Sequence, residues 1–273
     1  MRKLPRNKPR ILYRLFFGLV IVLGLVVCVF LGWQYWQKDW DGQSRYTLIE
    51  IGEEVTLKSY DPITHQGFTI FFPKNLEIET VSGRGFWQIG ALNRAGSSKW
   101  AADSIADYLG ISYNGVGGIT NRWDRFQWGR MTRAAIWKEI DLSESNYLEL
   151  VKTPDNLEVF RLSRTWDTKA RELFLDQPVA QEAQGVIIIN TVSYPGLGTN
   201  AGRVVESLGM ATRGIETQEE SIERCLVQGS PDLKDTASAR KLMKVFHCQW
   251  EDSDDTDLHL FLGEEYRTWK WGE

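Results

Sequence analysis

The sequence predicts a mixed α/β protein, of the α+β kind, carried on one N-terminal transmembrane helix. Three observations lead to this fold class. An uncharged apolar run covers nineteen residues, Leu15 to Trp33. Short β-prone segments follow between Arg45 and Phe72, and strand-like and helix-like segments alternate again between Val186 and Leu262. About 235 residues follow the membrane segment, which is enough for one large or two modest domains.

The apolar run is long enough, at about 1.5 Å rise per residue, to cross a hydrocarbon core of roughly 30 Å. Basic residues gather on the cytoplasmic side of membrane proteins, so residues from Gln37 onward are expected outside the cytoplasm. The bases that precede the run are Arg2, Lys3, Arg6, Lys8, Arg10 and Arg14. A cleaved signal peptide is the alternative, but bulky residues follow the run where a cleavage site needs small ones. The aromatic residues expected at the outer membrane interface are Trp33, Tyr35, Trp36 and Trp40.

The exported part is acidic. Without the cytoplasmic bases, 26 Lys/Arg stand against 36 Asp/Glu, a net charge of −10. This balance, with no basic stripe, argues against non-specific nucleic-acid binding, so we expect no nucleic-acid partner. The acidic cluster from Glu251 to Asp257 lacks the glycine and the glutamate of an EF-hand, which favours a solvated loop over a calcium site. The histidines have no zinc-site spacing, so we expect no metal or other cofactor.

Cys225 and Cys248 are the only cysteines of the exported part, because Cys28 lies in the membrane run. Cys225 lies in an expected strand and Cys248 follows an expected helix. A β-α-β crossover would return the chain beside that strand, and an oxidising compartment permits a disulfide. We therefore predict a Cys225–Cys248 disulfide, with two buried free thiols as the alternative.

The first half of the exported part reads as strands followed by helices. Short β-branched and aromatic segments predict strands rather than irregular loops at Tyr46 to Ile51, Val55 to Tyr60 and Gly67 to Phe72. Ser97 or Ser98 can cap a helix that Gly110 ends. Residues from about 122 to 139 are weakly helical. From Asp141 to Gln184 the hydrophobic pattern fades, which indicates a hinge between two domains.

The last part is more regular. Val186 to Val192 has the length and apolar character of a strand buried on both faces. Leu197 to Leu208 forms an amphipathic helix, and the Gly196-Leu197-Gly198 sequence before it favours a helix entry over a dinucleotide site, because its glycine spacing is wrong. Two strand-like segments, a helix capped by Asp235 or Thr236, and alternating leucines up to Leu262 follow. The order β-α-β-β-α-β predicts a compact domain of roughly 85 residues.

Two stretches resemble known bacterial families. VIIINTVSYPGLGTNAGRVVESLGMATRG, with ASARKLMKVF and DLHLFLGEEY, resembles the LytR C-terminal domain over residues 184–267. The asparagine of that family's Asn-Gly-Thr-Gly turn is kept in Asn190-Thr191-Val192-Ser193, but the glycines are lost. VTLKSYDPITHQGFTIFFPKNLEIE, QIGALNRAG and IADYLGI resemble a LytR-CpsA-Psr (LCP) domain.

The LCP resemblance implies a single membrane helix and transfer of glycopolymers from a polyprenyl-pyrophosphate carrier to peptidoglycan. In that family arginines grip the pyrophosphate and acidic residues hold magnesium, as guanidinium forks and carboxylates can do. Here Glu53-Glu54 replaces the family's Asp-Thr, and Pro73-Lys74-Asn75 replaces its Pro-Arg-Asp. Two arginines appear at an R-x-x-R spacing instead of R-x-R. What remains is a degenerate phosphate site of Glu53, Lys74, Arg161 and Arg164; the alternative for the arginines is a solvated charged helix face.

We therefore interpret the chain as a single-pass bacterial cell-membrane protein with an extracytoplasmic C-terminus and a degenerate, non-catalytic LCP-like domain. Its expected role is binding or scaffolding in the cell envelope, with cell-wall glycopolymer or envelope proteins as partners. The alternatives are an LCP-type phosphotransferase, which would need magnesium, and a tethered partner of another envelope enzyme. The expected segments are a cytoplasmic tail (1–14), an anchor (15–36), the LCP-like domain (37–140), a linker (141–183), the LytR C-terminal domain (184–268) and a tail (269–273).

Overall fold

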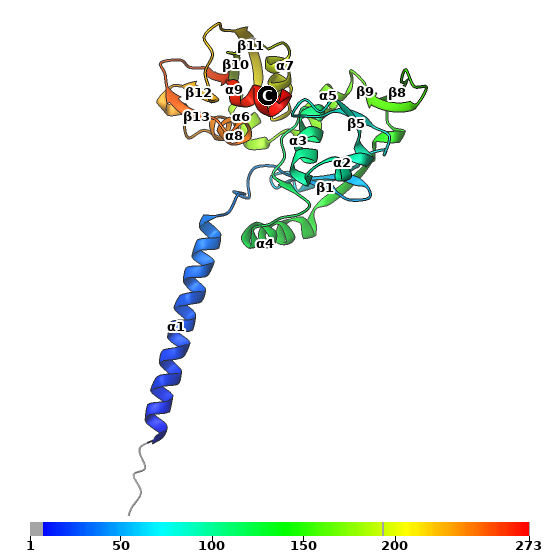
Figure 1. Ribbon diagram of the computed structural model, residues 1–273. Helices are drawn as coiled ribbons and strands as arrows, with labels where there is room; N and C mark the ends of the chain where they lie inside the picture. The colour runs from blue at the N-terminus through cyan, green and yellow to red at the C-terminus, as the bar shows by residue number, and fades with distance from the viewer. Residues whose placement is uncertain (1–7, 193, 273) are drawn as a thin grey trace, which may run out of the picture.

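The computed structural model describes residues 8–192 and 194–272; the first seven residues of the basic tail, Ser193 and Glu273 lie outside them. A long helix, α1 (Lys8–Trp36), leads into two lobes that pack side by side (Figure 1). We name residues 40–176 the first lobe and residues 177–262 the second lobe. This mixed α/β architecture with one apolar N-terminal helix confirms the predicted fold class.

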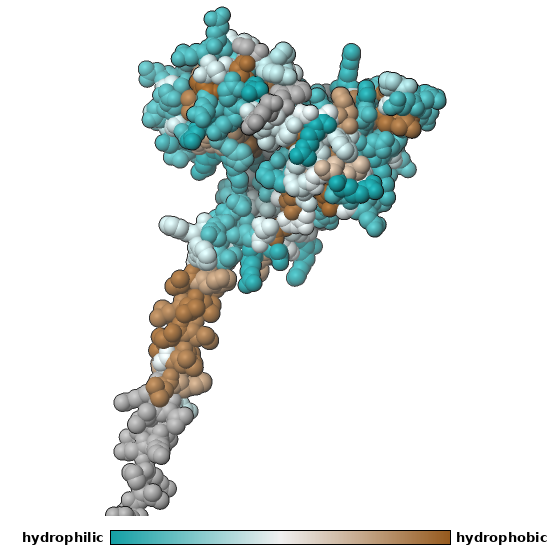
Figure 2. All heavy atoms as spheres, in the orientation of Figure 1, coloured by the Kyte–Doolittle hydropathy of each residue, from teal (hydrophilic) through white to brown (hydrophobic). Residues whose placement is uncertain are grey.

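Helix α1 packs against almost nothing along its apolar length. Residues Leu15–Trp36 are long and apolar enough to cross a membrane, and the apolar window is 0% buried. Figure 2 shows hydrophobic side chains along the face of the helix in view. A helix that is hydrophobic all round needs an apolar environment, since a soluble protein seldom exposes so large an apolar surface. The helix therefore has the properties of a membrane anchor.

A five-stranded sheet in the order β6-β1-β2-β3-β7 forms the first lobe. Two antiparallel pairs join β1 to β2 and β2 to β3, whereas β7 runs parallel to β3 and β6 parallel to β1. The three strands expected between residues 45 and 72 are all present. The strands are β1 (Tyr46–Ile51), β2 (Val55–Asp61), β3 (Gln66–Phe71), β6 (Gly115–Val116) and β7 (Ile136–Asp141).

Helix α3 (Ser98–Leu109) belongs to the core of this lobe. Ser97 caps it, because its hydroxyl accepts a hydrogen bond from the Trp100 N–H at 3.2 Å. Gly110 ends it in the left-handed conformation, at φ 67°. Two short strands, β4 (Glu77–Glu79) and β5 (Phe86–Gln88), and helix α2 (Leu92–Ala95) complete this region.

The segment 141–183, expected as a linker, is structured. It forms β8 (Leu148–Lys152), β9 (Glu158–Leu162), α5 (Trp166–Phe174) and α6 (Gln177–Glu182). Trp166 is fully buried in the first lobe, where its indole N–H donates to the Leu109 carbonyl at 2.8 Å. Much of the β8–β9 hairpin is exposed to solvent. Its sequence is therefore rich in polar residues and lacks the hydrophobic pattern from which strands are predicted. The division of the chain into functional domains stays a prediction.

Two further expectations in the first lobe are wrong. Trp40 was expected at the membrane interface, but it is only 1% exposed and packs against Tyr46, with ring centroids 5.0 Å apart. The helix expected over residues 122–139 is α4 (Arg122–Met131), and the chain then turns into strand β7. Pairing with β3 across the sheet overrides the weak helical pattern of residues 136–141.

The second lobe contains a sheet in the order β11-β10-β14-β12-β13, packed with α7 (Leu197–Ser207) and α8 (Ala237–Phe246). The apolar strand β10 lies between parallel neighbours β11 and β14. The sequence predicted the other four strands, α7 and α8, but not β13, which is mostly exposed and polar and therefore lacks a hydrophobic pattern. The strands are β10 (Gly185–Asn190), β11 (Ala211–Thr217), β12 (Leu226–Gly229), β13 (Gln249–Asp252) and β14 (Leu258–Leu262).

Two local features hold this lobe together. Gly198 lets α7 approach the sheet, because a Cβ at this position would lie 2.5 Å from the Ile215 Cγ2 atom. Cys225 and Cys248 directly precede the parallel neighbours β12 and β13, and they form a disulfide with a Cα–Cα distance of 4.5 Å. The crossover that ends at Cys248 thus returns the chain beside Cys225. Helix α9 (Glu264–Trp271) follows β14 and contacts both lobes.

Candidate functional site

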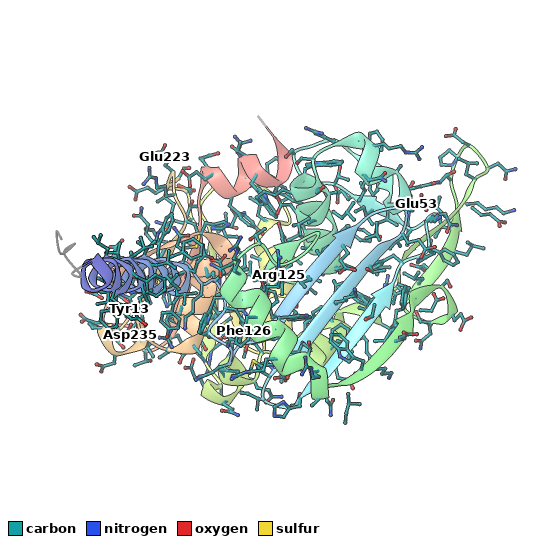
Figure 3. All side chains as sticks on the ribbon, turned by 90° about the horizontal axis from the view of Figure 1, so that it is seen from below. Tyr13, Glu53, Arg125, Phe126, Glu223 and Asp235 are labelled. Atoms are coloured by element: carbon teal, nitrogen blue, oxygen red, sulfur yellow. A yellow bond between two sulfur atoms is a disulfide. The ribbon has the colours of Figure 1, made fainter. Side chains whose placement is uncertain are left out.

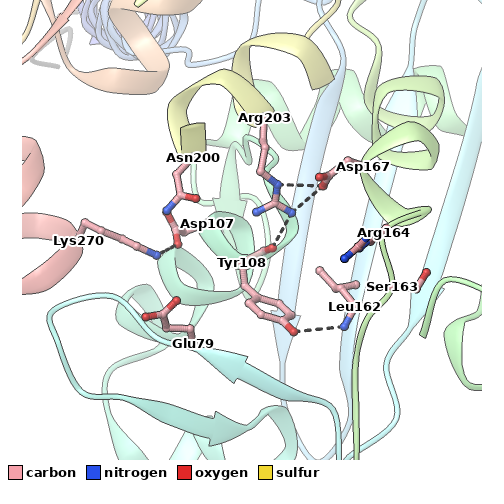
Figure 4. A pocket seen from close by; sticks show the side chains of 10 residues that line it. All are labelled: Glu79, Asp107, Tyr108, Leu162, Ser163, Arg164, Asp167, Asn200, Arg203 and Lys270. Atoms are coloured by element: carbon pink, nitrogen blue, oxygen red, sulfur yellow. Dashed lines mark hydrogen bonds and ion pairs between the residues drawn. The ribbon is translucent and has the colours of Figure 1, made fainter. Parts of the chain in front are cut away.

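A cavity of about 310 Å³ lies where the two lobes and α9 meet (Figure 4). Its walls come from β4, α3, the segment after β9, and α5 of the first lobe, from α7 of the second lobe, and from α9. Charged side chains dominate it. The lining residues are Glu79, Asp107, Tyr108, Leu162, Ser163, Arg164, Asp167, Asn200, Arg203 and Lys270.

The most buried charges of this pocket are Asp107 and Lys270. Their side chains are 4% and 3% exposed, and the Lys270 ammonium forms an ion pair with the Asp107 carboxylate. Burial raises the pKa of Asp107 above its ordinary value, and the neighbouring Lys270 acts against this rise. Because Asp107 belongs to α3 and Lys270 to α9, the pair attaches the C-terminal helix to the first lobe.

Arg203 connects the two lobes across the pocket. Its guanidinium reaches from α7 to the Asp167 carboxylate of α5, with an Nε–Oδ1 distance of 2.9 Å and an Nη2–Oδ1 distance of 2.8 Å. It also donates to the carbonyl of Tyr108 at 3.0 Å. Gly110 permits this approach, since a Cβ there would lie 2.9 Å from the Arg203 Cβ. Arg203 is therefore held in a fixed position by groups of the first lobe.

Arg164 is the third cation of the pocket, and none of the described residues bonds to its guanidinium. Within residues 8–192 and 194–272 its guanidinium has no hydrogen bond or ion pair, and it is exposed at the pocket wall (Figure 4). The Tyr108 hydroxyl accepts a hydrogen bond from the neighbouring Leu162 N–H at 3.2 Å, which fixes the backbone that carries Arg164. A free guanidinium beside a fixed one is suited to bind an anion that enters from solvent.

The structure brings only one of the four residues of the expected phosphate site into this pocket. Arg164 lines it, whereas Glu53 lies exposed in the turn between β1 and β2, and Lys74 lies exposed before β4. The Arg161 Nε donates to the Glu77 carboxylate at 2.8 Å, and the guanidinium lies 5.6 Å from the Phe86 ring centroid. Arg161 is thus engaged with its own lobe. The role of these residues toward phosphate stays a prediction.

Sequence reasoning missed the other charged residues of the pocket. Asp107 lies in a helix that was predicted from its apolar face, which gives no sign of a functional carboxylate. Lys270 lies between two tryptophans close to the C-terminus. Arg203 and Asp167 are 36 residues apart, and Asp107 and Lys270 are 163 apart. Pairs so distant in sequence leave no local motif, so their approach depends on the packing of the two lobes.

The pocket does not fit a magnesium ion. Two of its three carboxylates, Asp107 and Asp167, are each bound to a cation of the protein, which leaves Glu79, and hard divalent metals need several free oxygen ligands. In the part of the chain that the structure describes, no group of three or more His, Cys, Asp or Glu side chains is placed to hold a metal. Asp107 and Asp167 are therefore not available as metal ligands while these ion pairs are formed.

No protein-family model matches this sequence, and no curated protein matches it. Among solved structures, TagT bound to LI-WTA is similar, with 8% identity, a TM-score of 0.41, and coverage of 50% of this chain and 92% of that chain. TagU of B. subtilis has 10% identity and a TM-score of 0.32, covering 47% of this chain and 95% of that one. Similarities of this size establish neither a family nor an activity.

Proposed function

We propose that this chain is a membrane-anchored, extracytoplasmic protein of the bacterial cell envelope that binds a phosphate-bearing cell-wall glycopolymer without transferring it. The observation that carries the proposal is the pair of arginines in the inter-lobe pocket. Arg203 is fixed by Asp167, and Arg164 is unpaired among the described residues and exposed at the same pocket. A guanidinium binds phosphate oxygens through two parallel hydrogen bonds, and Arg164 is placed to offer this face to a phosphodiester. The Nε and Nη2 donors of Arg203 are instead engaged by Asp167 and Tyr108.

The size of the pocket agrees with a small segment of such a polymer. Its volume of about 310 Å³ lies near the lower limit of ordinary ligand sites. The pocket is open to solvent at Arg164, so a polymer can enter with one repeat unit and leave its remaining length outside. The resemblance of the sequence to LCP and LytR C-terminal domains supports a glycopolymer as the ligand, and it assigns residues 184–268 to a LytR-type domain.

Binding is favoured over transfer because two of the three carboxylates that line the pocket, Asp107 and Asp167, are paired with cations of the protein. A phosphotransferase needs charged groups aimed at the phosphate and a metal ion or base beside them. Lys270 neutralises Asp107, and Arg203 neutralises Asp167; among the residues that the structure describes, no cation is bonded to Glu79, the third carboxylate of the pocket. The LCP-type phosphotransferase is the second candidate; for it, Asp167 would have to release Arg203 before it could hold a metal.

The test is equilibrium binding of a synthetic glycerol-phosphate oligomer to the full chain in lipid nanodiscs. We expect binding that Arg164→Gln weakens about tenfold or more, which is the usual effect of losing one charged hydrogen bond. Arg94→Gln is the matched control, because Arg94 is an exposed arginine of the same lobe that does not line the pocket. Equal affinities of the two variants would overturn the assignment of the pocket. An uncharged glucose oligomer should not compete.

A further inference from the structure

Helix α4 presents an unusual face at the base of the first lobe. Figure 1 shows it at the end of the lobe nearest to α1, lying crosswise to that helix. Arg122, Phe126, Arg130 and Arg133 follow a helical spacing, and all four are exposed. Phe126 is 62% exposed, a large fraction for an aromatic ring. The opposite side of the helix packs Trp128 and Met131 against the core around Trp40.

The exposed face is strongly basic in a part of the protein that is acidic overall. Arg125 joins the other three arginines in the stretch Arg122–Ala134, and it is exposed too. Asp124 is the one acid of that stretch, but it is only 1% exposed and accepts a hydrogen bond from the Asp39 N–H at 2.9 Å. Its charge thus points into the protein. Four arginines and one large aromatic ring remain on the outside.

Direct contacts fix α4 at the end of the membrane helix. The Asn121 side chain caps α4 and donates to the carbonyl of Gln37 at 2.9 Å. The rings of Trp123 and Tyr35 meet edge to face with centroids 5.4 Å apart. The Arg122 guanidinium lies 5.8 Å from the ring centroid of Phe30, within the apolar stretch of α1. The N-terminus of α4 is therefore level with the last turns of the anchor.

We propose that α4 is an interfacial helix that lies on the extracytoplasmic surface of the membrane that α1 crosses and binds the headgroups of anionic lipids. Amphipathic helices of this kind place aromatic side chains at the boundary of the acyl chains and arginines among the phosphates. Figure 3 is a view from below, the side toward which the anchor extends in Figure 1, and Arg125 and Phe126 are labelled on α4 in this view. The proposal rests on α1 crossing the membrane and is independent of what the inter-lobe pocket binds.

This contact would fix the orientation of the first lobe on the bilayer. The contacts between α1 and α4 hold the first lobe to the end of the anchor, but a single transmembrane helix can still tilt in the bilayer together with the lobe that it carries. A second point of attachment removes that freedom, because α4 touches the membrane beside the anchor. The inter-lobe pocket would then stay at a constant height and direction relative to the lipid surface.

The experiment measures the depth of a probe at position 126. The full chain with Cys28→Ser and Phe126→Cys carries a fluorophore and is reconstituted into vesicles that contain lipids with a nitroxide quencher. Leu157→Cys, at the tip of the β8–β9 hairpin and 57% exposed, provides the matched control position. With phosphatidylglycerol present, we expect the probe at 126 to be quenched several-fold more than the probe at 157.

Charge is tested by a set of variants in the Phe126→Cys protein. Replacing the four arginines by glutamine should remove most of the quenching, and replacing them by lysine should retain it. Pure phosphatidylcholine vesicles and high salt should reduce it in the same way, since exposed charges are screened. Equal quenching at positions 126 and 157 in anionic vesicles would overturn the proposal. If quenching at position 126 is the same in neutral and anionic vesicles and is unchanged by the glutamine substitutions, α4 does not bind anionic headgroups, and that part of the proposal is overturned.

Discussion

Arg203 of the second lobe and Asp167 of the first lobe form an ion pair with an Nη2–Oδ1 distance of 2.8 Å. This pair spans the boundary between the lobes and also forms part of the pocket wall. Its geometry means that the arrangement of the lobes and the position of a candidate ligand-binding arginine depend on the same contact. Changes that separate the lobes are therefore expected to weaken ligand binding as well.

A double-mutant cycle tests this inter-lobe pair. Arg203→Gln and Asp167→Asn should show a coupling of about 0.5–1 kcal/mol in the free energy of unfolding, because the two side chains are partly exposed. Their exposed fractions are 23% and 44%. The matched control is the Lys152–Glu158 pair, with an Nζ–Oε1 distance of 3.6 Å and exposed fractions of 66% and 56%. An equally large coupling energy in the control pair would show that Arg203 and Asp167 stabilise the protein no more than an ordinary surface ion pair.

The buried pair of Lys270 and Asp107 should matter more for stability. Lys270→Met leaves the Asp107 carboxylate buried without its cation, so we expect a loss of about 3 kcal/mol, measured by denaturant unfolding in detergent. Adding Asp107→Leu should recover much of the loss, because an apolar pair replaces the buried charge. Lys99→Met, at a side chain that is 70% exposed, serves as the control and should change stability by less than about 0.5 kcal/mol. A loss no larger in Lys270→Met than in Lys99→Met would contradict this.

The disulfide between Cys225 and Cys248 is tested by counting thiols. Denatured, unreduced protein from the cell surface should show one free thiol, which belongs to Cys28. Replacing both bonded cysteines by serine should lower stability by about 3 kcal/mol, since the bond closes a loop of 23 residues in the unfolded chain. Three free thiols in the native protein would show that the bond does not form in the cell.

Topology is tested by reporter fusions. The bases before Leu15 predict a cytoplasmic N-terminus, so a reporter that works only outside the cytoplasm should be active after Glu273 and silent at Arg10. A reporter that needs the cytoplasm should give the opposite pattern. Activity of the external reporter at Arg10 alone would reverse the orientation and remove the basis for an extracytoplasmic function.

The sequence was sufficient for the features that depend on local pattern. The anchor, the central strand β10 and the caps at Ser97 and Thr236 follow from hydrophobic runs and capping residues. It failed where a long-range contact decides the structure. Trp40 is buried because it packs against Tyr46 and Tyr60, and strand β7 forms because it pairs with β3 in parallel.

The candidate site shows the same division. Arg164 was found because it lies in a short motif with Arg161, yet the fold separates the two arginines and pairs only Arg161 with a carboxylate. Arg203, Asp107 and Lys270 come together from three helices that are distant in sequence. No spacing rule connects residues that meet only when two lobes pack, so these members of the site required the structure.

The central claim, binding without transfer, is tested most directly with a labelled glycopolymer carried on a polyprenyl pyrophosphate. The full chain in nanodiscs is incubated with this donor, a peptidoglycan oligosaccharide acceptor and magnesium, and the position of the label is followed. We predict that the label binds the protein and stays on the lipid carrier, because the pocket carboxylates Asp107 and Asp167 are paired with Lys270 and Arg203. Transfer of the label to the acceptor would contradict the claim and establish a working phosphotransferase.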